Sequence, residues 1–395
     1  MRKSPPVWKI VIFLILFSNL PETFAQSFAQ PLRQCWKLET ETLRNAQIAS
    51  DNENSFFIPL PEGIVKAVNI KNGETIWQSE VGGEITSPLL FEQNSLYVIS
   101  EDNSENISES ISESQVKQKT YTLRSLSFLT GITQWKKEFK GTSASAMYLS
   151  SSSENLCIVT DRGYLYLLDK RTGKIVDEKS LDIQISNSSD LRGNRLYIGS
   201  SDNRILAVTF SGSLSDVEEL RKLKYAPTII TPAVGGDFLY VGDRLGNVSA
   251  IGIKEKKLLW ESRAGADITS ITELADKLLV SSSDNYIYLL SRKNGNRVWK
   301  KRLAGRNSGM PPVKDGVAVF SPLGERTATF LELLKGKQVN QISLNETKGD
   351  DNFFTDGPNI AGDVVILSTL NGFYAFSSGS NCGTATMKKV VGLRN

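Results

Sequence analysis

The stretch LLVSSSDNYIYLLSRKNGNRVW, residues 278–299, decides the fold. Its first two apolar runs are separated by the turn residues Ser283-Asp284-Asn285. A second turn, Asn294-Gly295, then leads to Trp299. Hydrophobic runs broken by Asp-Asn and Asn-Gly are typical of β-strands joined by tight turns. The stretch therefore predicts three consecutive antiparallel strands.

The same pattern recurs along the chain at a nearly fixed period. The aspartate of the first turn is found at Asp102, Asp161, Asp202, Asp243 and Asp284, with spacings of 59, 41, 41 and 41 residues. The penultimate residue of the middle strand falls at Ala67, Ser125, Leu167, Ala207, Ala250, Leu289, Phe330 and Ala375. A period near 41 residues with several short strands in each unit is typical of a β-propeller. We therefore predict an all-β, eight-bladed β-propeller of four-stranded antiparallel blades over residues 31–380.

The unit around residues 182–225 is degenerate, because Ser211-Gly212-Ser213 replaces its second turn and no tryptophan follows. Asp177 and Asn340 stand where two other units would have tryptophan. Merging a degenerate pair of units would give seven blades, which is the alternative to eight.

The two ends of the repeat array complement each other. Trp36 precedes Trp77 by 41 residues, so it occupies the tryptophan position of a unit whose earlier strands are missing. The last unit, 364–376, has its inner and middle strands but no following tryptophan. We therefore expect the N-terminal strand to complete the last blade and close the ring, which would remove exposed sheet edges.

Residues 1–25 are predicted to be a secretory signal peptide. A basic start with Arg2, Lys3 and Lys9 precedes eleven apolar residues, 10–20, which are too few to span a bilayer. Thr23-Phe24-Ala25 provides a cleavage site, and Ser27-Phe28-Ala29 is equally suitable. Neither site is followed by a cysteine, so lipid attachment there is not expected. The protein is predicted to be exported, with the periplasm as its compartment and the extracellular space as the alternative.

One insertion breaks the period. Residues 101–120, EDNSENISESISESQVKQKT, are polar and contain no aromatic side chain before Tyr121, so they are predicted to be disordered. The insertion leaves the chain at the Asp102 turn and should project from the same rim as the other aspartate turns. It is either a partner-contacting loop or a neutral surface extension. Residues 381–395 are expected to form a frayed C-terminal tail.

Composition narrows the functional classes. The formal net charge of +3 does not favour a nucleic-acid partner. The chain contains no histidine, so no imidazole is available as a general base or a metal ligand. No residue is nominated as catalytic, cofactor-binding or metal-binding, and no cofactor is expected.

The three cysteines are of two kinds. Cys157 stands where other units have tyrosine, and we expect it to be a small buried core residue. Cys35 and Cys382 are expected on the two strands that ring closure brings together. An exported protein meets an oxidising compartment, so a Cys35–Cys382 disulfide is one outcome and two free thiols the other.

The repeated aromatic and acidic residues each have two interpretations. The tryptophans, Trp36, Trp77, Trp135, Trp260 and Trp299, could stack on a ligand or pack between neighbouring blades, and their fixed period favours packing. The repeated aspartates could form a ring of carboxylates for cations. An aspartate at the first position of a turn accepts hydrogen bonds from its own backbone, which is a sufficient explanation.

The motifs LYLLDKRTGKIV (165–176) and IYLLSRKNGNRVW (287–299) resemble the PQQ-like repeat of quinoprotein-type β-propellers. The resemblance covers residues 31–380. The dehydrogenases of that family carry an adjacent cysteine pair and a calcium site, and this chain has no adjacent cysteines. It is more similar to the non-enzymatic, BamB-like members.

The resemblance implies a monomeric scaffold that binds protein partners through the loops of one rim, in envelope or outer-membrane protein assembly. It implies no nucleic acid and no membrane span after signal cleavage. The alternatives are a PQQ-binding oxidoreductase and a small-ligand or carbohydrate-binding sensor.

Overall fold

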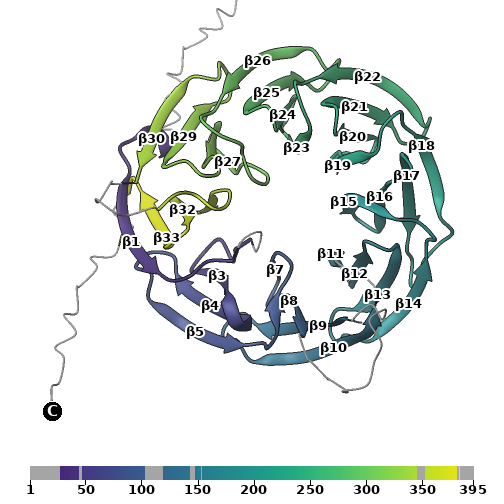
Figure 1. The fold of residues 1–395 in the computed structure, drawn as a ribbon, viewed down its shortest axis with the longest axis horizontal. Coiled ribbons are helices and arrows are strands. Elements are labelled where there is room, and N and C mark those ends of the chain that lie inside the picture. The colour runs from purple at the N-terminus through teal and green to yellow at the C-terminus, as the bar shows by residue number, and fades with distance from the viewer. Residues whose placement is uncertain are drawn as a thin grey trace, which may run out of the picture.

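A computed structural model describes residues 27–43, 47–102, 119–142, 147–152, 154–344, 352–379 and 382. The predicted signal peptide, most of the insertion and most of the tail lie outside the described residues. The chain forms eight antiparallel sheets arranged as blades around a ring (Figure 1). The prediction of an eight-bladed propeller is therefore confirmed, and the seven-blade alternative is wrong.

The blades follow one another in chain order, and their strands are named a to d from the centre outwards. Blade one contains β2 (Ala49–Ser50), β3 (Ser55–Leu60), β4 (Ile64–Asn69) and β5 (Thr75–Glu80). Blade two contains β6 (Glu84–Ile85), β7 (Leu90–Glu92), β8 (Ser95–Asp102), β9 (Lys119–Ser127) and β10 (Thr133–Thr142), with β6 and β7 both paired to β8. Blade three contains β11 (Met147–Ser151), β12 (Asn155–Thr160), β13 (Tyr164–Asp169) and β14 (Ile175–Ser180). Blade four contains β15 (Ile185–Arg192), β16 (Arg195–Ser200), β17 (Arg204–Thr209) and β18 (Glu218–Lys222).

The second half of the ring repeats this organisation. Blade five contains β19 (Pro227–Pro232), β20 (Phe238–Asp243), β21 (Asn247–Gly252) and β22 (Lys257–Arg263). Blade six contains β23 (Ile268–Glu273), β24 (Lys277–Ser282), β25 (Tyr286–Ser291) and β26 (Arg297–Arg302). Blade seven contains β27 (Val313–Lys314), β28 (Val317–Phe320), β29 (Thr327–Glu332) and β30 (Gln338–Ser343). Blade eight contains β31 (Asn359–Ala361), β32 (Val364–Thr369), β33 (Gly372–Ser377) and, as its outer strand, β1 (Arg33–Glu39). Two 3₁₀ turns, η1 (Ser27–Ala29) and η2 (Pro61–Gly63), complete the described elements.

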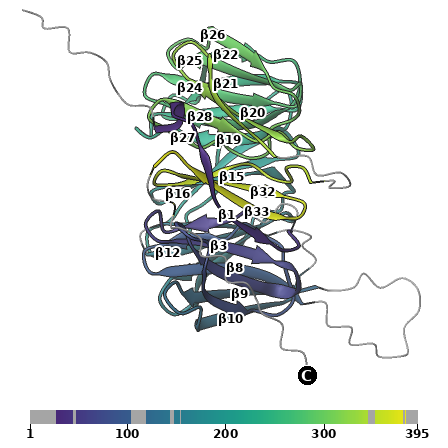
Figure 2. The ribbon, with the colours of Figure 1, turned by 90° about the vertical axis from the view of Figure 1, so that its left-hand side faces the viewer.

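The ring is closed by the two ends of the array, as expected. β1 pairs antiparallel with β33, and Trp36 lies opposite Ala375. Figure 2 shows this purple strand running beside the yellow strands of the last blade. The same register places Trp77 opposite Ala67 and Trp299 opposite Leu289, so the N-terminal strand is a true outer strand.

The apolar core is divided among the seams between blades. The buried apolar residues form eight clusters, and each cluster joins side chains of two neighbouring blades. The b and c strands are buried on both faces, as in the VVILST run of β32. The outer strands alternate between exposed and half-buried positions, as in β26. Burial therefore holds each blade mainly against its two neighbours.

Each of the five tryptophans in the described residues docks on the next blade. The indole Nε1 atoms of Trp36, Trp77, Trp135, Trp260 and Trp299 donate to the carbonyl oxygens of Ile70, Phe128, Lys170, Arg292 and Leu333, respectively, at 2.7–3.0 Å. The indole rings lie against Gly73, Gly131, Gly173, Gly295 and Gly336, respectively, where an added Cβ would come within 2.3–2.8 Å of the ring. The glycine in the turn between strands c and d is thus required by the tryptophan of the preceding blade.

Seams without tryptophan use polar contacts instead. The Asp177 carboxylate of blade three accepts a hydrogen bond from Leu214 N of blade four at 2.8 Å. Asn340 of blade seven donates to the carbonyl oxygens of Phe28 and Gln30, at 2.9 and 2.7 Å. The Phe28 side chain is fully buried and its ring centroid lies 5.8 Å from that of Phe330. The segment 27–30 thus takes the place of the turn that blade eight lacks.

Lys256 shows that the glycine is not needed where the preceding blade has no tryptophan. It occupies the glycine position in the turn between strands c and d of blade five, with φ at +55°. Blade four, which precedes it, has no tryptophan to occupy the space around this Cβ. The Lys256 ammonium instead pairs with Glu218 of blade four, at 2.9 Å.

Substituting these glycines should separate steric conflict from backbone strain. Gly212 has φ at +77° with nothing near its missing Cβ, so Gly212→Ala should cost only the left-handed conformation, about 1–2 kcal/mol. Gly295→Ala adds a clash with the Trp260 indole and should cost about 1–3 kcal/mol more. Denaturant unfolding of both variants measures the difference, and equal losses would contradict the docking role of Trp260.

Candidate functional site

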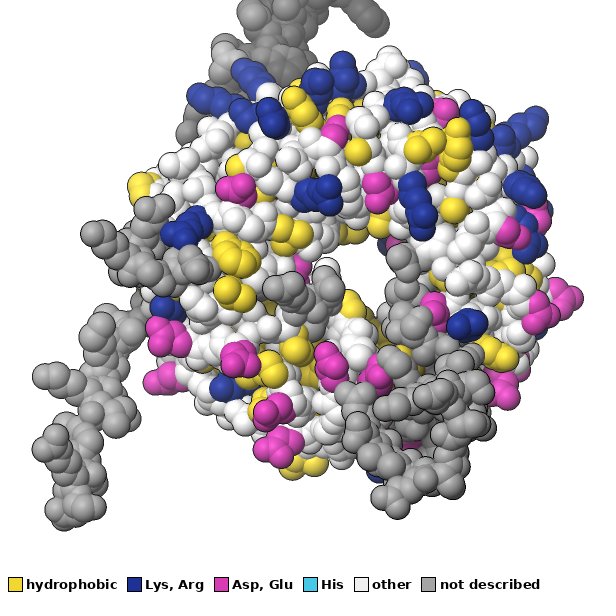
Figure 3. Space-filling view, viewed as in Figure 1, with side chains coloured by type: hydrophobic (Ala, Val, Ile, Leu, Met, Phe, Trp, Pro, Cys, Tyr) yellow, Lys and Arg dark blue, Asp and Glu magenta, His cyan; other side chains and the backbone are white. Residues whose placement is uncertain are grey.

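The turns between strands b and c share one rim with the loops between strand d and the next blade's strand a. In blade three the Leu181 amide donates to Gly163 O and the Ile185 amide donates to Asp161 O, both at 2.9 Å. Figure 3 views this rim, which surrounds an opening at the centre of the ring. The predicted rim of aspartate turns is thus one continuous surface of loops.

Asp243 and Asp284 hold backbone groups of this rim. Asp243 is 7% exposed, and its carboxylate accepts bonds from the amides of Leu245 and Asn247, each at 2.9 Å. Asp284 accepts bonds from the Tyr286 amide and, across the loop, from the Gly265 amide, both at 3.0 Å. These aspartates therefore position the turns that carry them.

A tyrosine completes the Asp284 contact. The Tyr288 hydroxyl donates to Asp284 Oδ2 at 2.5 Å. Burial of the phenol and the neighbouring carboxylate raise the pKa of Tyr288 to about 12. The phenol therefore stays protonated and keeps this bond at all moderate pH values.

The other turn aspartates have different neighbours. Asp202 accepts bonds from Ser200 Oγ and from Arg204 Nε, and these contacts lower the pKa of its carboxyl. Asp102 accepts a bond from Thr122 Oγ1 at 3.3 Å. Asp161 contributes its carbonyl oxygen to the loop contact described above. Among the described residues, no group of three or more Asp, Glu, Cys or His side chains could hold a metal ion.

The insertion begins later than the sequence indicated. Glu101 and Asp102 lie in β8 and pair with Tyr121 and Thr120 of β9. Residues 101, 102, 119 and 120 therefore belong to the blade, because the b–c hairpin of blade two is longer than in its neighbours. The remaining residues, 103–118, lie outside the described part of the chain.

Charge on this rim is unevenly distributed, with a basic arc and an acidic arc, although Asp202, Asp243 and Asp284 also lie in turns of blades four to six. The basic arc, on blades four to six and the loop that follows, consists of Lys224, Arg244, Arg263, Arg302 and Arg306, all exposed. The acidic arc, on blades one and two, consists of Glu62, Glu80, Glu84 and Asp102, of which the first three are exposed. Figure 3 shows Lys and Arg gathered over β22 and β26, with fewer of them on the opposite half of the ring, while Asp and Glu are visible on both halves. No residue of either arc forms an ion pair with another described residue.

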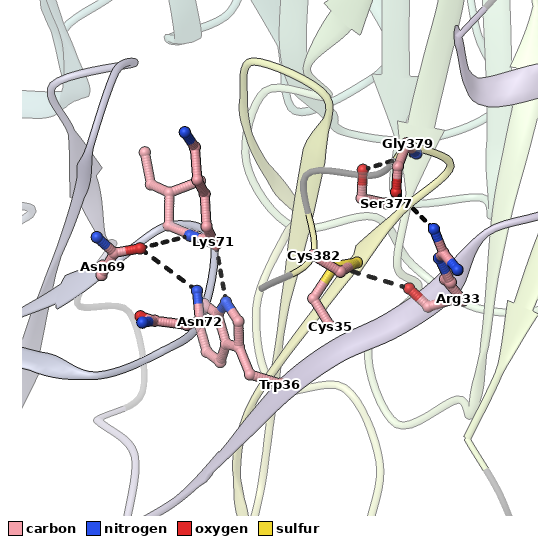
Figure 4. Close-up of a disulfide and its surroundings, with 10 residues drawn as sticks. Arg33, Cys35, Trp36, Asn69, Lys71, Asn72, Ser377, Gly379 and Cys382 are labelled. Carbon is pink, nitrogen blue, oxygen red and sulfur yellow. Dashed lines mark hydrogen bonds between the residues drawn. A yellow bond between two sulfur atoms is a disulfide. The ribbon is translucent and has the colours of Figure 1, made fainter. Parts of the chain in front are cut away.

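The closing strand also carries a disulfide (Figure 4). Cys35 and Cys382 are bonded, with their Cα atoms 4.8 Å apart and 347 residues between them in sequence. Cys382 does not lie on a strand as expected, because β33 ends at Ser377 and the chain bends before reaching Cys35. The Arg33 guanidinium donates to Gly379 O at 3.0 Å and holds the same segment against β1.

Cys157 is chemically separate from this bridge. It is a free thiol, fully buried in β12 opposite Leu167. Burial raises the pKa of the thiol to about 12, so it stays protonated and is a poor nucleophile.

The wall of the ring contains a hollow near strands a of blades two to four. It has a volume of about 380 Å³ and is lined by residues that include Leu90, Leu149 and Asp190. Burial raises the pKa of the Asp190 carboxyl. Sequence analysis did not single out this aspartate, because it lies outside the repeated turn.

A second cavity lies between blades five and six, near Trp260 and Arg292. Sequence analysis did not single out the polar residues of this cavity either. Arg292 occupies a turn position that blades one, two and seven fill with the apolar residues Ile70, Phe128 and Leu333, and that blade three fills with Lys170. Only an alignment of the repeats would reveal the difference.

Comparison with known proteins identifies relatives of two kinds. The family model described as "Outer membrane protein assembly factor BamB" matches residues 119–215 and 209–389. The outer membrane protein assembly factor BamB of Yersinia pestis is 24% identical over 338 residues, which is 82% of each chain. A tetrathionate hydrolase of Acidithiobacillus ferrooxidans is 25% identical over 217 residues, which is 45% of this chain and 42% of the hydrolase.

Solved structures share the same fold. The crystal structure of BamB from Moraxella catarrhalis matches with a TM-score of 0.63 and 17% identity, over 88% of this chain and 99% of that chain. The computationally designed Ika8 protein matches with a TM-score of 0.69 and 14% identity, over 87% and 99% of the two chains.

Removing the closing disulfide should destabilise the ring. The Cys35→Ser, Cys382→Ser double variant loses a link between segments 347 residues apart and should lose about 2–4 kcal/mol of unfolding free energy. Denaturant unfolding with and without reductant measures this. The reductant should shift the wild type and leave the double variant unchanged. Equal sensitivity of both proteins would contradict a stabilising bridge.

The pKa of Asp190 predicts a pH-dependent penalty. Its folded pKa lies above the ordinary aspartate value, so the penalty is absent below that ordinary value, grows as pH rises from it towards the folded pKa, and is fully present above the folded pKa. Asp190→Asn should therefore raise the melting temperature at neutral pH and have little effect in acid. The exposed Asp182→Asn is the control, and a gain that persists undiminished in acid would contradict burial as the cause.

Proposed function

Because the chain belongs to the family of outer membrane protein assembly factor BamB, we propose that it is an exported scaffold that binds a protein partner in outer-membrane protein assembly. The family match over residues 119–389 carries this proposal. The relative from Yersinia pestis, whose match spans 82% of each chain, supports it. Partner binding requires no catalytic group, which agrees with a chain that contains no histidine.

The partner is proposed to dock on the rim that carries the two charged arcs. Long basic side chains without ion-pair partners among the described residues are free to meet carboxylates of another protein. Opposite charges at the two ends of one surface also fix the orientation of a partner, because the reversed orientation places like charges together. We therefore propose a partner with an acidic patch over the basic arc and a basic patch over the acidic arc.

Export is part of the proposal. Residues 1–25 have the features of a signal peptide, and a disulfide persists in an oxidising compartment such as the periplasm. Of the two cleavage sites, the structure is compatible with Ala25, because cleavage after Ala29 would remove the buried Phe28. Among the described residues, no helix has the length and apolar character needed to cross a bilayer.

Charge reversal on the rim tests the proposal. The variant Arg244→Glu, Arg263→Glu, Arg302→Glu should lose the proteins that crosslink to the wild type in the cell envelope. Its matched control is Lys71→Glu, Arg171→Glu, Lys335→Glu, three exposed residues in turns on the opposite rim. The control should keep the same partners. Retention of all partners by the first variant, or equal loss by both, would contradict docking on this rim.

An activity test separates the scaffold from the enzymatic alternatives. The tetrathionate hydrolase match and the PQQ-like repeat motivate two assays on purified protein: tetrathionate consumption, and dye-linked oxidation after addition of PQQ and calcium. We expect neither to exceed a blank. Turnover in either assay would favour an enzyme, whatever the outcome of the crosslinking.

A further inference from the structure

The cavity between blades five and six opens on the rim opposite the charged arcs. It has a volume of about 400 Å³, within the range of small-ligand pockets. Phe238, Tyr240, Leu259 and Trp260 supply its apolar wall, and Arg292 and Lys293 supply positive charge. The Tyr240 and Trp260 ring centroids are 6.2 Å apart.

In the equivalent seam between blades one and two, aromatic rings occupy the positions that Arg292 and Glu273 hold here. Phe128 accepts the Trp77 indole bond with its carbonyl oxygen, as Arg292 accepts that of Trp260. Phe91 pairs with Leu96 at the position where Glu273 pairs with Leu278. The Phe91 ring lies 5.4 Å from Phe57 and 5.6 Å from Phe128, centroid to centroid. At blades five and six an Arg292–Glu273 pair replaces these two rings.

This ion pair fixes a guanidinium in the wall of the cavity. Arg292 Nη1 lies 3.0 Å from Glu273 Oε1, and Arg292 Nε donates to the Tyr240 hydroxyl at 2.8 Å. Glu273 is held in turn by the Val234 amide at 2.7 Å. The guanidinium therefore keeps one orientation, and its Nη2 has no hydrogen-bond partner among the described residues.

The mouth of the cavity has an excess of positive charge. Asp276 pairs with Lys277, and Glu273 pairs with Arg292. Lys293 is exposed and forms no ion pair with a described residue. An anionic group at the mouth would therefore gain a charge-assisted contact, whereas a cationic group would be repelled.

We propose that this cavity is a binding site for a small aromatic carboxylate, separate from the partner-binding rim. The aromatic ring packs against Trp260, Phe238 and Leu259, and the carboxylate meets Lys293 and the free edge of Arg292. The apolar wall supplies affinity, and the two cations select the anion.

Paired probes of equal shape test the proposal. Indole-3-propionate should bind the full mature protein in calorimetry at millimolar concentration. Its neutral amide, indole-3-propionamide, should bind about tenfold more weakly, because it lacks the charge. Absence of acid binding, or equal binding of acid and amide, would overturn the proposal.

Three variants locate the site. Lys293→Gln should weaken the acid about tenfold and leave the amide unchanged. Lys71→Gln, at the same turn position in blade one, should change neither. The double variant Glu273→Phe, Arg292→Phe copies the two rings of the first seam and should abolish binding of both probes while the protein still melts cooperatively. Undiminished binding in a folded double variant would place the probe elsewhere and overturn the proposal, and Lys293→Gln gives an independent test should that variant not fold.

Discussion

The docking of an indole on the turn of the next blade is the contact on which the ring depends. A single tryptophan satisfies its own buried N–H, satisfies a carbonyl of the neighbouring blade and covers a backbone that has no Cβ. The contact couples two blades through rigid groups, so the angle between them is fixed. The rim loops are placed only as accurately as the blades that carry them, and the charged arcs span several blades. Partner recognition on the rim therefore requires well-defined seams.

Where no indole docks on the next blade, the turn of that blade does not need a glycine. Blade four has none, and the next blade accommodates Lys256 with its bulky side chain and positive φ. The ammonium of that lysine reaches back to Glu218, and Arg221 donates to the Lys256 carbonyl at 3.1 Å. These exposed polar contacts are weaker and more sensitive to salt than a buried indole. The ring thus has strong and weak seams: both seams of blade four depend on polar contacts, whereas the seam after blade seven, which also lacks an indole, is filled by the segment 27–30.

Much of the fold could be predicted from the sequence because its determinants are local and repeated. Turn aspartates and tryptophans at period 41 indicate blades, and an isolated Trp36 indicates closure. The candidate site was harder to predict from the sequence. The basic arc joins residues of three blades and a loop, and a net charge of +3 conceals its separation from the acidic arc. Nothing in the sequence distinguishes Arg292 and Glu273. Their replacement of two aromatic rings is visible only when two seams are compared in the structure. The sequence left the pairing of Cys382 with Cys35 open, and it placed Cys382 on a strand because strand periodicity does not encode the bend that follows β33.

Closure by an N-terminal strand also sets the order of assembly. β1 leaves the ribosome early, yet its partner β33 is made almost last, and Cys35 and Cys382 are separated by 347 residues. Hairpins within blades can form as they emerge, whereas the final seam must wait for the far end of the array. During that interval β1 exposes an unpaired edge and the buried face of Trp36. The growing chain therefore passes through an open arc with an unpaired strand edge, which favours aggregation, and the ring closes late in biogenesis.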